Sequence, residues 1–233
     1  MRQVVLDTET TGLETSRGHR IIEIGCVELV DRRLTRHSYH QYINPQRPVD
    51  EEAYQVHQIG NDFLADKPVF AEVADEFLQF IEGAELIIHN AAFDVGFIDY
   101  EFSLLGGRLK RVSDYCSVLD TLTYARKKHP GQKNNLDALC LRYGIDNSHR
   151  ELHGALLDAE ILADVYLAMT GGQTSLMLDA SDEADGEASA SIVRLPERRA
   201  RLKVIRANEE ELKAHESKLD AIDSVSKGSI WRQ

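Results

Sequence analysis

The stretch VVLDTETTG at residues 4–12 decides how this chain is organised. Its β-branched, apolar start predicts a buried strand, and residues i and i+2 of a strand point to the same face. Asp7 and Glu9 therefore lie side by side. Two adjacent carboxylates repel each other, so a fold keeps such a pair most simply by binding a divalent cation. A solvated strand end before a turn is the alternative interpretation.

Bulk composition narrows the class of protein. The 233 residues suffice for one domain of about 150 to 200 residues plus an extension. No apolar run reaches about 18 residues and no signal-peptide pattern opens the chain, so we expect a cytoplasmic protein without a membrane span. Three cysteines without C-x-x-C spacing argue against disulfides and structural zinc. The net charge of −12 disfavours non-specific DNA binding, unless cations or a partner hold the DNA.

The composition changes after residue 170, which predicts three regions. Residues 1–170 alternate apolar segments with short turns and form the expected folded domain. Residues 171–191 are acidic and rich in small side chains, which predicts a flexible linker. Residues 192–233 begin with basic side chains, contain a possible helix at 208–219 and include Trp231.

The first region has the order of elements expected of a mixed α/β sheet. Strands are predicted at 3–6, 21–30, 34–43 and 86–88, and helices at 68–81, 92–105, 117–128, 136–142 and 156–169. The short link 31–33 between two strands predicts a hairpin, so part of the sheet is antiparallel. Strands that later alternate with helices predict a mixed sheet flanked by helices.

Two more acidic side chains fall near predicted helix starts. Asp94 lies in the first turn after a buried strand, where stabilisation of the helix dipole by about 0.3–1 kcal/mol is the simpler reading. Asp158 lies early in the helix that follows His153-Gly154. A histidine at a loop-to-helix junction suits a general base with a pKa near neutrality, although a lone histidine is more often structural.

Three motifs occur in a fixed order: Asp7-x-Glu9, Asn90-x-x-Phe93-Asp94 and His153-x-x-x-x-Asp158. Together they resemble the exonuclease motifs of the DnaQ-like 3′–5′ exonucleases, in the DEDDh subgroup whose third motif contains histidine. Residues 70–105, 134–141 and 152–172 are similar to the proofreading subunits of bacterial replicative polymerases. The resemblance therefore covers nearly the whole chain. It implies a ribonuclease-H-like fold with a mixed five-stranded sheet.

The resemblance implies a two-metal site. The residues that it assigns to two divalent cations, Mg²⁺ or Mn²⁺, are Asp7, Glu9, Asp94 and Asp158. Hard oxygen ligands without cysteine fit those ions. His153 is the implied general base. The expected reaction removes mispaired 3′-terminal nucleotides of DNA as 5′-monophosphates.

The resemblance also implies contacts with the terminal nucleotide. The residues concerned are Asp7, Glu9, Glu52, His57 and Asp158. Glu52 and His57 fall in a predicted loop or short helix, where a solvated surface is an equally good reading. Leu13 and Phe93 are candidates for an apolar wedge beside that nucleotide.

The tail predicts two docking segments. Residues 173–178, QTSLML, resemble the short peptide that docks replication proteins on the sliding clamp, with Gln173, Leu176 and Leu178 as candidate contacts. A polar linker with some apolar residues is the alternative. The resemblance implies that residues 192–233, including Trp231, bind the polymerase α subunit. It leaves open a small theta-like subunit on the catalytic domain.

Three other functions compete with proofreading. An RNA-trimming exoribonuclease of the same superfamily would have the same motifs, and the clamp-like peptide and long tail argue against it. A mainly structural polymerase subunit would not need the five catalytic-type residues. A DNA-binding module would need a larger basic patch than residues 126–129 supply.

Overall fold

The computed structural model describes residues 1–147, 154–171 and 207–225. The chain divides into two units, Met1–Leu178 and Asp179–Gln233. The elements are β1 (Arg2–Thr10), η1 (Thr15–Arg17), β2 (Ile21–Val30), β3 (Arg33–Tyr42), α1 (Glu51–His57), α2 (Asn61–Leu64), α3 (Phe70–Ile81), β4 (Glu85–Ile88), α4 (Ala91–Leu104), η2 (Val112–Asp114), β5 (Ser117–Asp120), α5 (Thr121–Lys128), α6 (Leu136–Tyr143), α7 (Ala155–Thr170) and α8 (Glu209–Val225). Within these ranges no helix is both long and apolar enough to cross a bilayer.

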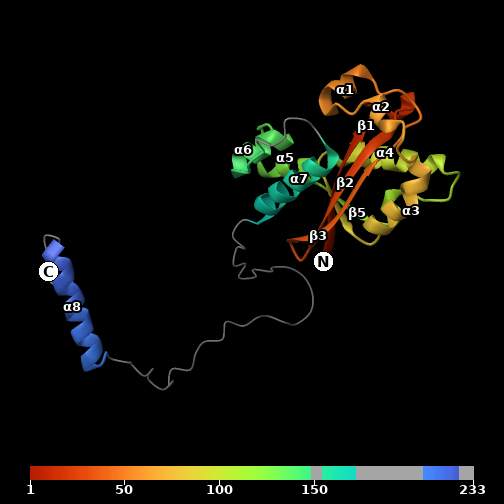
Figure 1. Cartoon of the computed structure of the whole chain (residues 1–233). Coiled ribbons are helices and arrows are strands. Elements are labelled where there is room, and N and C mark those ends of the chain that lie inside the picture. The colour runs from red at the N-terminus through yellow and green to blue at the C-terminus, as the bar shows by residue number, and fades with distance from the viewer. Residues whose placement is uncertain (148–153, 172–206, 226–233) are drawn as a thin grey trace, which may run out of the picture. The chain divides into compact units, whose positions relative to one another are not determined.

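The first unit is built on a mixed five-stranded sheet in the order β3-β2-β1-β4-β5. β1 pairs antiparallel with β2 and parallel with β4, and β5 joins β4 in parallel. Helices flank the sheet, with α3 and α4 on one side and α5 to α7 on the other (Figure 1). The predicted mixed sheet is confirmed.

The side chains of the central strand alternate between two hydrophobic cores. Val4 and Leu6 pack in the cluster that includes α3 and α4. Val5 packs in the cluster that includes α6 and α7. Asp7 and Glu9 continue the series of Val5, so the strand delivers both carboxylates to the α7 side of the sheet. β1 runs four residues beyond its predicted end, and both carboxylates lie inside the strand.

The β2–β3 hairpin has a two-residue turn. Asp31 and Arg32 both have positive φ, 48° and 62°, as a type I′ turn requires. Val30 pairs with Arg33, so β3 begins one residue earlier than predicted.

The helix predicted at 117–128 is wrong over its first four residues. These residues form β5, an edge strand in which Val118 and Leu119 pair with Leu86 and Ile87. Asp120 ends the strand and caps α5, because its side chain accepts hydrogen bonds from the backbone of the first helical turn. This strand brings the count to the five that the family resemblance implied.

The remaining predicted elements of the first unit agree with the structure within two residues. α1 resolves the predicted loop or short helix after β3 as a helix. Asn135 caps α6, since its side chain accepts a hydrogen bond from the Ala138 amide. In the second unit, α8 extends six residues past its predicted end and Leu219 is its buried side chain.

Gly25 allows α7 to approach the sheet closely. It lies in β2 directly opposite Asp7, on the face that α7 covers. A Cβ atom on Gly25 would lie 2.2 Å from the Ala155 carbonyl carbon and from the Leu156 amide nitrogen. Both clashes are with backbone, so the helix itself would have to move. The missing side chain therefore sets how near the first turn of α7 lies to β1.

We predict that Gly25→Ala destabilises the protein by about 1–3 kcal/mol, the usual cost of overpacking a core. Urea unfolding measures the change. The matched control is Gly96→Ala in α4, where an added Cβ meets nothing within 4 Å. An unfolding midpoint of Gly25→Ala equal to that of the parent would contradict the packing argument.

Candidate active site

Three carboxylates meet at the end of the central strand. Asp7 and Glu9 come from β1, and Asp158 comes from the first turn of α7. One oxygen of each lies within 4.8 Å of the others. All three line a cavity of about 250 Å³. The oxygen-only donor set at this spacing fits a hard divalent cation such as Mg²⁺ or Mn²⁺.

Asp94 reaches the same cavity from the other side of the sheet. It lies in the first turn of α4 and is 3% exposed. The Thr8 hydroxyl donates a hydrogen bond of 2.7 Å to Asp94 Oδ1. Thr8 faces the opposite way from its neighbours Asp7 and Glu9, which explains why Asp94 lines the cavity without joining the 4.8 Å group.

Burial makes the ionised form of the Asp94 carboxyl energetically unfavourable. Desolvation raises the pKa of its carboxyl from the usual 3.8 to about 7, while the hydrogen bond from Thr8 acts in the opposite direction. A cation held by the neighbouring carboxylates would favour the ionised form. The four acidic residues predicted from the sequence thus surround one cavity that suits divalent metal ions.

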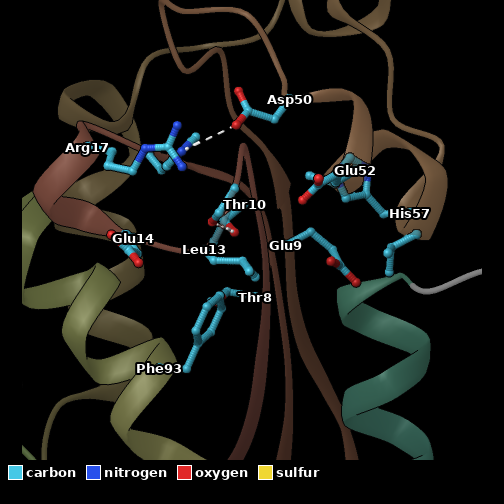
Figure 2. A pocket seen from close by; sticks show the side chains of 14 residues that line it. Thr8, Glu9, Thr10, Leu13, Glu14, Arg17, Asp50, Glu52, His57 and Phe93 are labelled. Carbon is cyan, nitrogen blue, oxygen red and sulfur yellow. Dashed lines mark hydrogen bonds and ion pairs between the residues drawn. The ribbon is translucent and has the colours of Figure 1, made fainter.

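A second cavity of about 380 Å³ adjoins the first and shares Thr8, Glu9 and Phe93 with it. Glu52 and His57, both from α1, line this cavity and lie across from Glu9 (Figure 2). His57 is buried, and its Nδ1 accepts a hydrogen bond from the Ile59 amide. The structure therefore brings both residues, predicted from resemblance alone, to the site.

Leu13 and Phe93 form an apolar side of this cavity. They lie next to each other, away from Glu52 and His57 (Figure 2). Leu13 is 77% exposed, which is unusual for a large apolar side chain. Its exposure leaves it available to contact a ligand in the cavity.

A buried polar network that the sequence did not reveal fixes the loop that carries Leu13. The Thr11 hydroxyl is hydrogen-bonded to His19 Nδ1 at 3.0 Å, and His19 Nε2 lies 3.5 Å from Asp50 Oδ2. The Asp50 amide donates to the Thr11 carbonyl. Burial, followed by nearby Arg47, lowers the pKa of His19. Because Asp50 precedes α1, the network ties this loop to the helix of Glu52 and His57.

Several predicted residues lie outside the described ranges. They are His153, Gln173, Leu176, Leu178 and Trp231. Among the described residues, sequence reasoning missed Thr8, Gly25 and His19. Gly25 had a usable signal, because a glycine inside a β-branched strand often marks a close approach of backbone. Thr8 and His19 had none, since their partners are distant in sequence or depend on the loop conformation.

Comparisons with known proteins agree with this geometry. Residues 4–166 match the family described as Exonuclease. DNA polymerase III subunit epsilon of Salmonella typhimurium and that of Escherichia coli are each 55% identical to the chain over 236 residues, covering 99% of the chain and 97% of each relative. The subunit of the same name from Pasteurella multocida is 52% identical, over 100% of the chain and 94% of the relative.

Solved structures share the fold. Exonuclease X in complex with 5′ overhanging duplex DNA has a TM-score of 0.58 at 24% identity, over 72% of this chain and 91% of that one. The nuclease domain of 3′hExo, a DEDDh family member bound to rAMP, has a TM-score of 0.62 at 20% identity, over 72% and 90%. At these identities the likeness concerns the fold.

We predict that Asp94→Asn stabilises the cation-free protein at alkaline pH. The folded-state pKa of about 7 exceeds the unfolded value, so the contribution of Asp94 to stability falls as pH rises from the usual 3.8 to about 7, and the loss is complete above 7. Asparagine keeps the acceptor for Thr8 without the charge. In EDTA the variant should gain on the order of 1–4 kcal/mol over the parent at pH 8, and little near pH 4.

Urea unfolding of both proteins across this pH range measures the gain, and Asp75→Asn at an exposed position is the control. A gain that does not vary with pH would show that burial of the Asp94 charge is not its cause.

Proposed function

The chain belongs to the Exonuclease family and to its branch of DNA polymerase III epsilon subunits, and we propose that it proofreads DNA by removing mispaired 3′-terminal nucleotides as 5′-monophosphates. The observation that carries this proposal is the meeting of Asp7, Glu9 and Asp158 within 4.8 Å, beside a cavity large enough for a nucleotide. The enzyme is a 3′–5′ exonuclease.

The carboxylates of the site would hold two divalent cations, Mg²⁺ or Mn²⁺. When bound, such ions lower the pKa of a water and neutralise the charge that develops on the leaving 3′ oxygen. Asp7, Glu9 and Asp158 offer oxygens from one side, and Asp94 offers its carboxylate from the other. Four carboxylates against two such ions leave the site near neutral once a substrate phosphate is present, so a chain of net charge −12 can still bind DNA here.

The chain supplies the remaining groups itself. His153, which directly precedes Gly154 and α7, would accept the proton of the attacking water at an imidazole nitrogen. Glu52 and His57 would contact the terminal nucleotide from α1, opposite the carboxylates. Asp7, Glu9 and Asp158 complete the proposed set of contacts with the substrate.

Selection of mispaired ends requires no reading of the sequence. A mismatched end has already lost pairing energy, so it separates from the template and enters the cavity at lower cost than a matched end. Leu13 and Phe93 would then pack between the terminal base and its neighbour. Selectivity would therefore come from the cost of melting the duplex.

The tail would tether the nuclease to the replication machinery. Residues 173–178, with Gln173, Leu176 and Leu178, would bind the sliding clamp, and residues 192–233, including Trp231, would bind the polymerase α subunit. A linker of about 20 residues reaches about 25 Å, which keeps the nuclease at high effective concentration near the primer end. We also propose that a theta-like subunit binds residues 1–170. The whole assembly would be cytoplasmic.

The proposed function predicts a pattern of mononucleotide release. With Mg²⁺, the full chain should release nucleotides faster from a 3′-mismatched DNA primer than from a matched one, and faster than from RNA of equal length. EDTA should abolish release, and Asp158→Asn should lower it by several orders of magnitude. A preference for RNA would instead favour an exoribonuclease, and no release from well-folded protein would favour a structural subunit.

The role of His153 gives a separate prediction. His153→Ala should lower kcat on single-stranded DNA about 10²- to 10⁴-fold, the usual contribution of a general base, without weakening binding of the substrate. Single-turnover kinetics measure the first effect and KM the second. His37→Ala, at an exposed position on β3, is the matched control. Full activity of the His153 variant would exclude the proposed base.

A further inference from the structure

A hollow continues on the other side of Leu13 and Phe93. This third cavity has a volume of about 400 Å³ and lies against η1 and the first two turns of α4. It shares Leu13 and Phe93 with the cavity proposed for the terminal nucleotide. The two apolar side chains therefore separate two compartments, and the third cavity begins where the terminal-nucleotide cavity ends.

A fourth cavity extends this hollow along the same helix. It has a volume of about 340 Å³ and shares Gly96 with the third cavity. Gly96, Tyr100 and Ser103 line it at spacings of four and three residues, so they lie on one face of α4. The lining of the two cavities defines the α4 groove, with Leu13, Phe93, Gly96, Tyr100, Lys110 and Arg111 as its main residues.

The far end of the α4 groove is positively charged. Lys110 and Arg111 are exposed and line it, and within the described ranges no salt bridge engages either side chain. Arg108 in the same loop differs, because it pairs with Asp75 at 3.3 Å. Two cations available to a ligand, in a chain of net charge −12, favour an anionic occupant.

Two acidic residues also lie along the groove. Asp99 lines the fourth cavity, and its carboxylate accepts a hydrogen bond of 2.7 Å from the Val112 amide. Glu14 lines the third cavity, and it accepts a bond from Ser16 within the same turn. The anionic groups thus have partners within the protein, whereas the described part of the chain places no carboxylate in a salt bridge with Lys110 or Arg111.

We propose that the α4 groove holds the nucleotides upstream of the cleaved bond, with Lys110 and Arg111 on their backbone phosphates. This inference rests on the proposed exonuclease function, which puts the 3′-terminal nucleotide on the other side of Leu13 and Phe93. The strand then runs with its 5′ direction toward the loop at 108–111. Tyr100, which is half-buried in the groove wall, offers a ring on which a base can stack.

The length of the groove sets the number of nucleotides. From Phe93 to Ser103 the helix rises about 15 Å. A stacked strand has one phosphate per about 3.4 Å, so the groove holds about four nucleotides. Affinity for single-stranded DNA should therefore rise with length up to about five or six nucleotides and then level off.

The test compares Lys110→Ala/Arg111→Ala with Arg108→Ala, on single-stranded DNA of 2 to 10 nucleotides. We expect KM of the parent to fall with length and then level off. In the double variant KM should decrease much less with DNA length, so that KM for the 10-mer is about 5- to 30-fold higher than in the parent while kcat is unchanged. The slope of log(1/KM) against log[salt] should be smaller in magnitude by about 1.4, because two phosphate contacts are lost. Arg108→Ala should behave like the parent, because its side chain is already paired.

A second pair of variants tests the groove by filling it. An added Cβ at Gly96 meets nothing within 4 Å, so a larger side chain there would project into the groove without a clash with the protein. Gly96→Phe should therefore raise KM for the 10-mer but not for a dinucleotide, whereas Leu104→Phe, at an exposed position of α4 outside the groove lining, should leave KM unchanged. Thermal melting establishes that each variant is folded.

A small substrate separates this inference from the function on which it rests. The p-nitrophenyl ester of thymidine 5′-monophosphate occupies only the catalytic cavities, and all groove variants should hydrolyse it like the parent. Unchanged KM and salt slope of the double variant at every length would overturn the groove assignment. Failure of the parent to hydrolyse both the ester and DNA would overturn the proposed exonuclease function instead.

Discussion

Repulsion between like charges is the constraint on which the rest of this structure depends. Asp7, Glu9 and Asp158 have oxygens within 4.8 Å of one another, and Asp94 lies buried on the same cavity. Such an arrangement costs free energy in the folded chain and is useful only when cations occupy it. The surrounding elements provide the stability that allows it: two hydrophobic cores, one on each face of the sheet, enclose the strand that carries the first two carboxylates.

The side chains of β1 alternate between the two faces of the sheet, so each face carries a different part of the site. The α7 face receives three acidic groups, whereas the α4 face receives Thr8, which bonds Asp94. Beyond the strand, the Thr11–His19–Asp50 network joins the loop of Leu13 to the start of α1. One strand and its following loop therefore position the acidic residues of β1, Leu13 and the helix that carries Glu52 and His57.

Local patterns predicted much of this arrangement. The period of two placed Asp7 and Glu9 on one face, and helix-start signals placed Asp94 and Asp158 in first turns, as the structure shows. β5 was missed because four residues at a sheet edge carry too short a pattern to separate strand from helix. The separation of Asp94 from the other three, and the arrival of Glu52 and His57 beside Glu9, depend on packing between distant segments, which local periodicity does not encode.

The close packing of α7 on β2 at Gly25 also bears on the order of events during synthesis. The ribosome makes β1 first, and about 150 residues later it makes the helix that carries Asp158. Until that helix has emerged and settled against the glycine, the nascent chain has only part of its acidic set. On the proposed role of Asp158, a growing or truncated copy lacks a complete active site, so nuclease activity would begin only after the whole domain has folded.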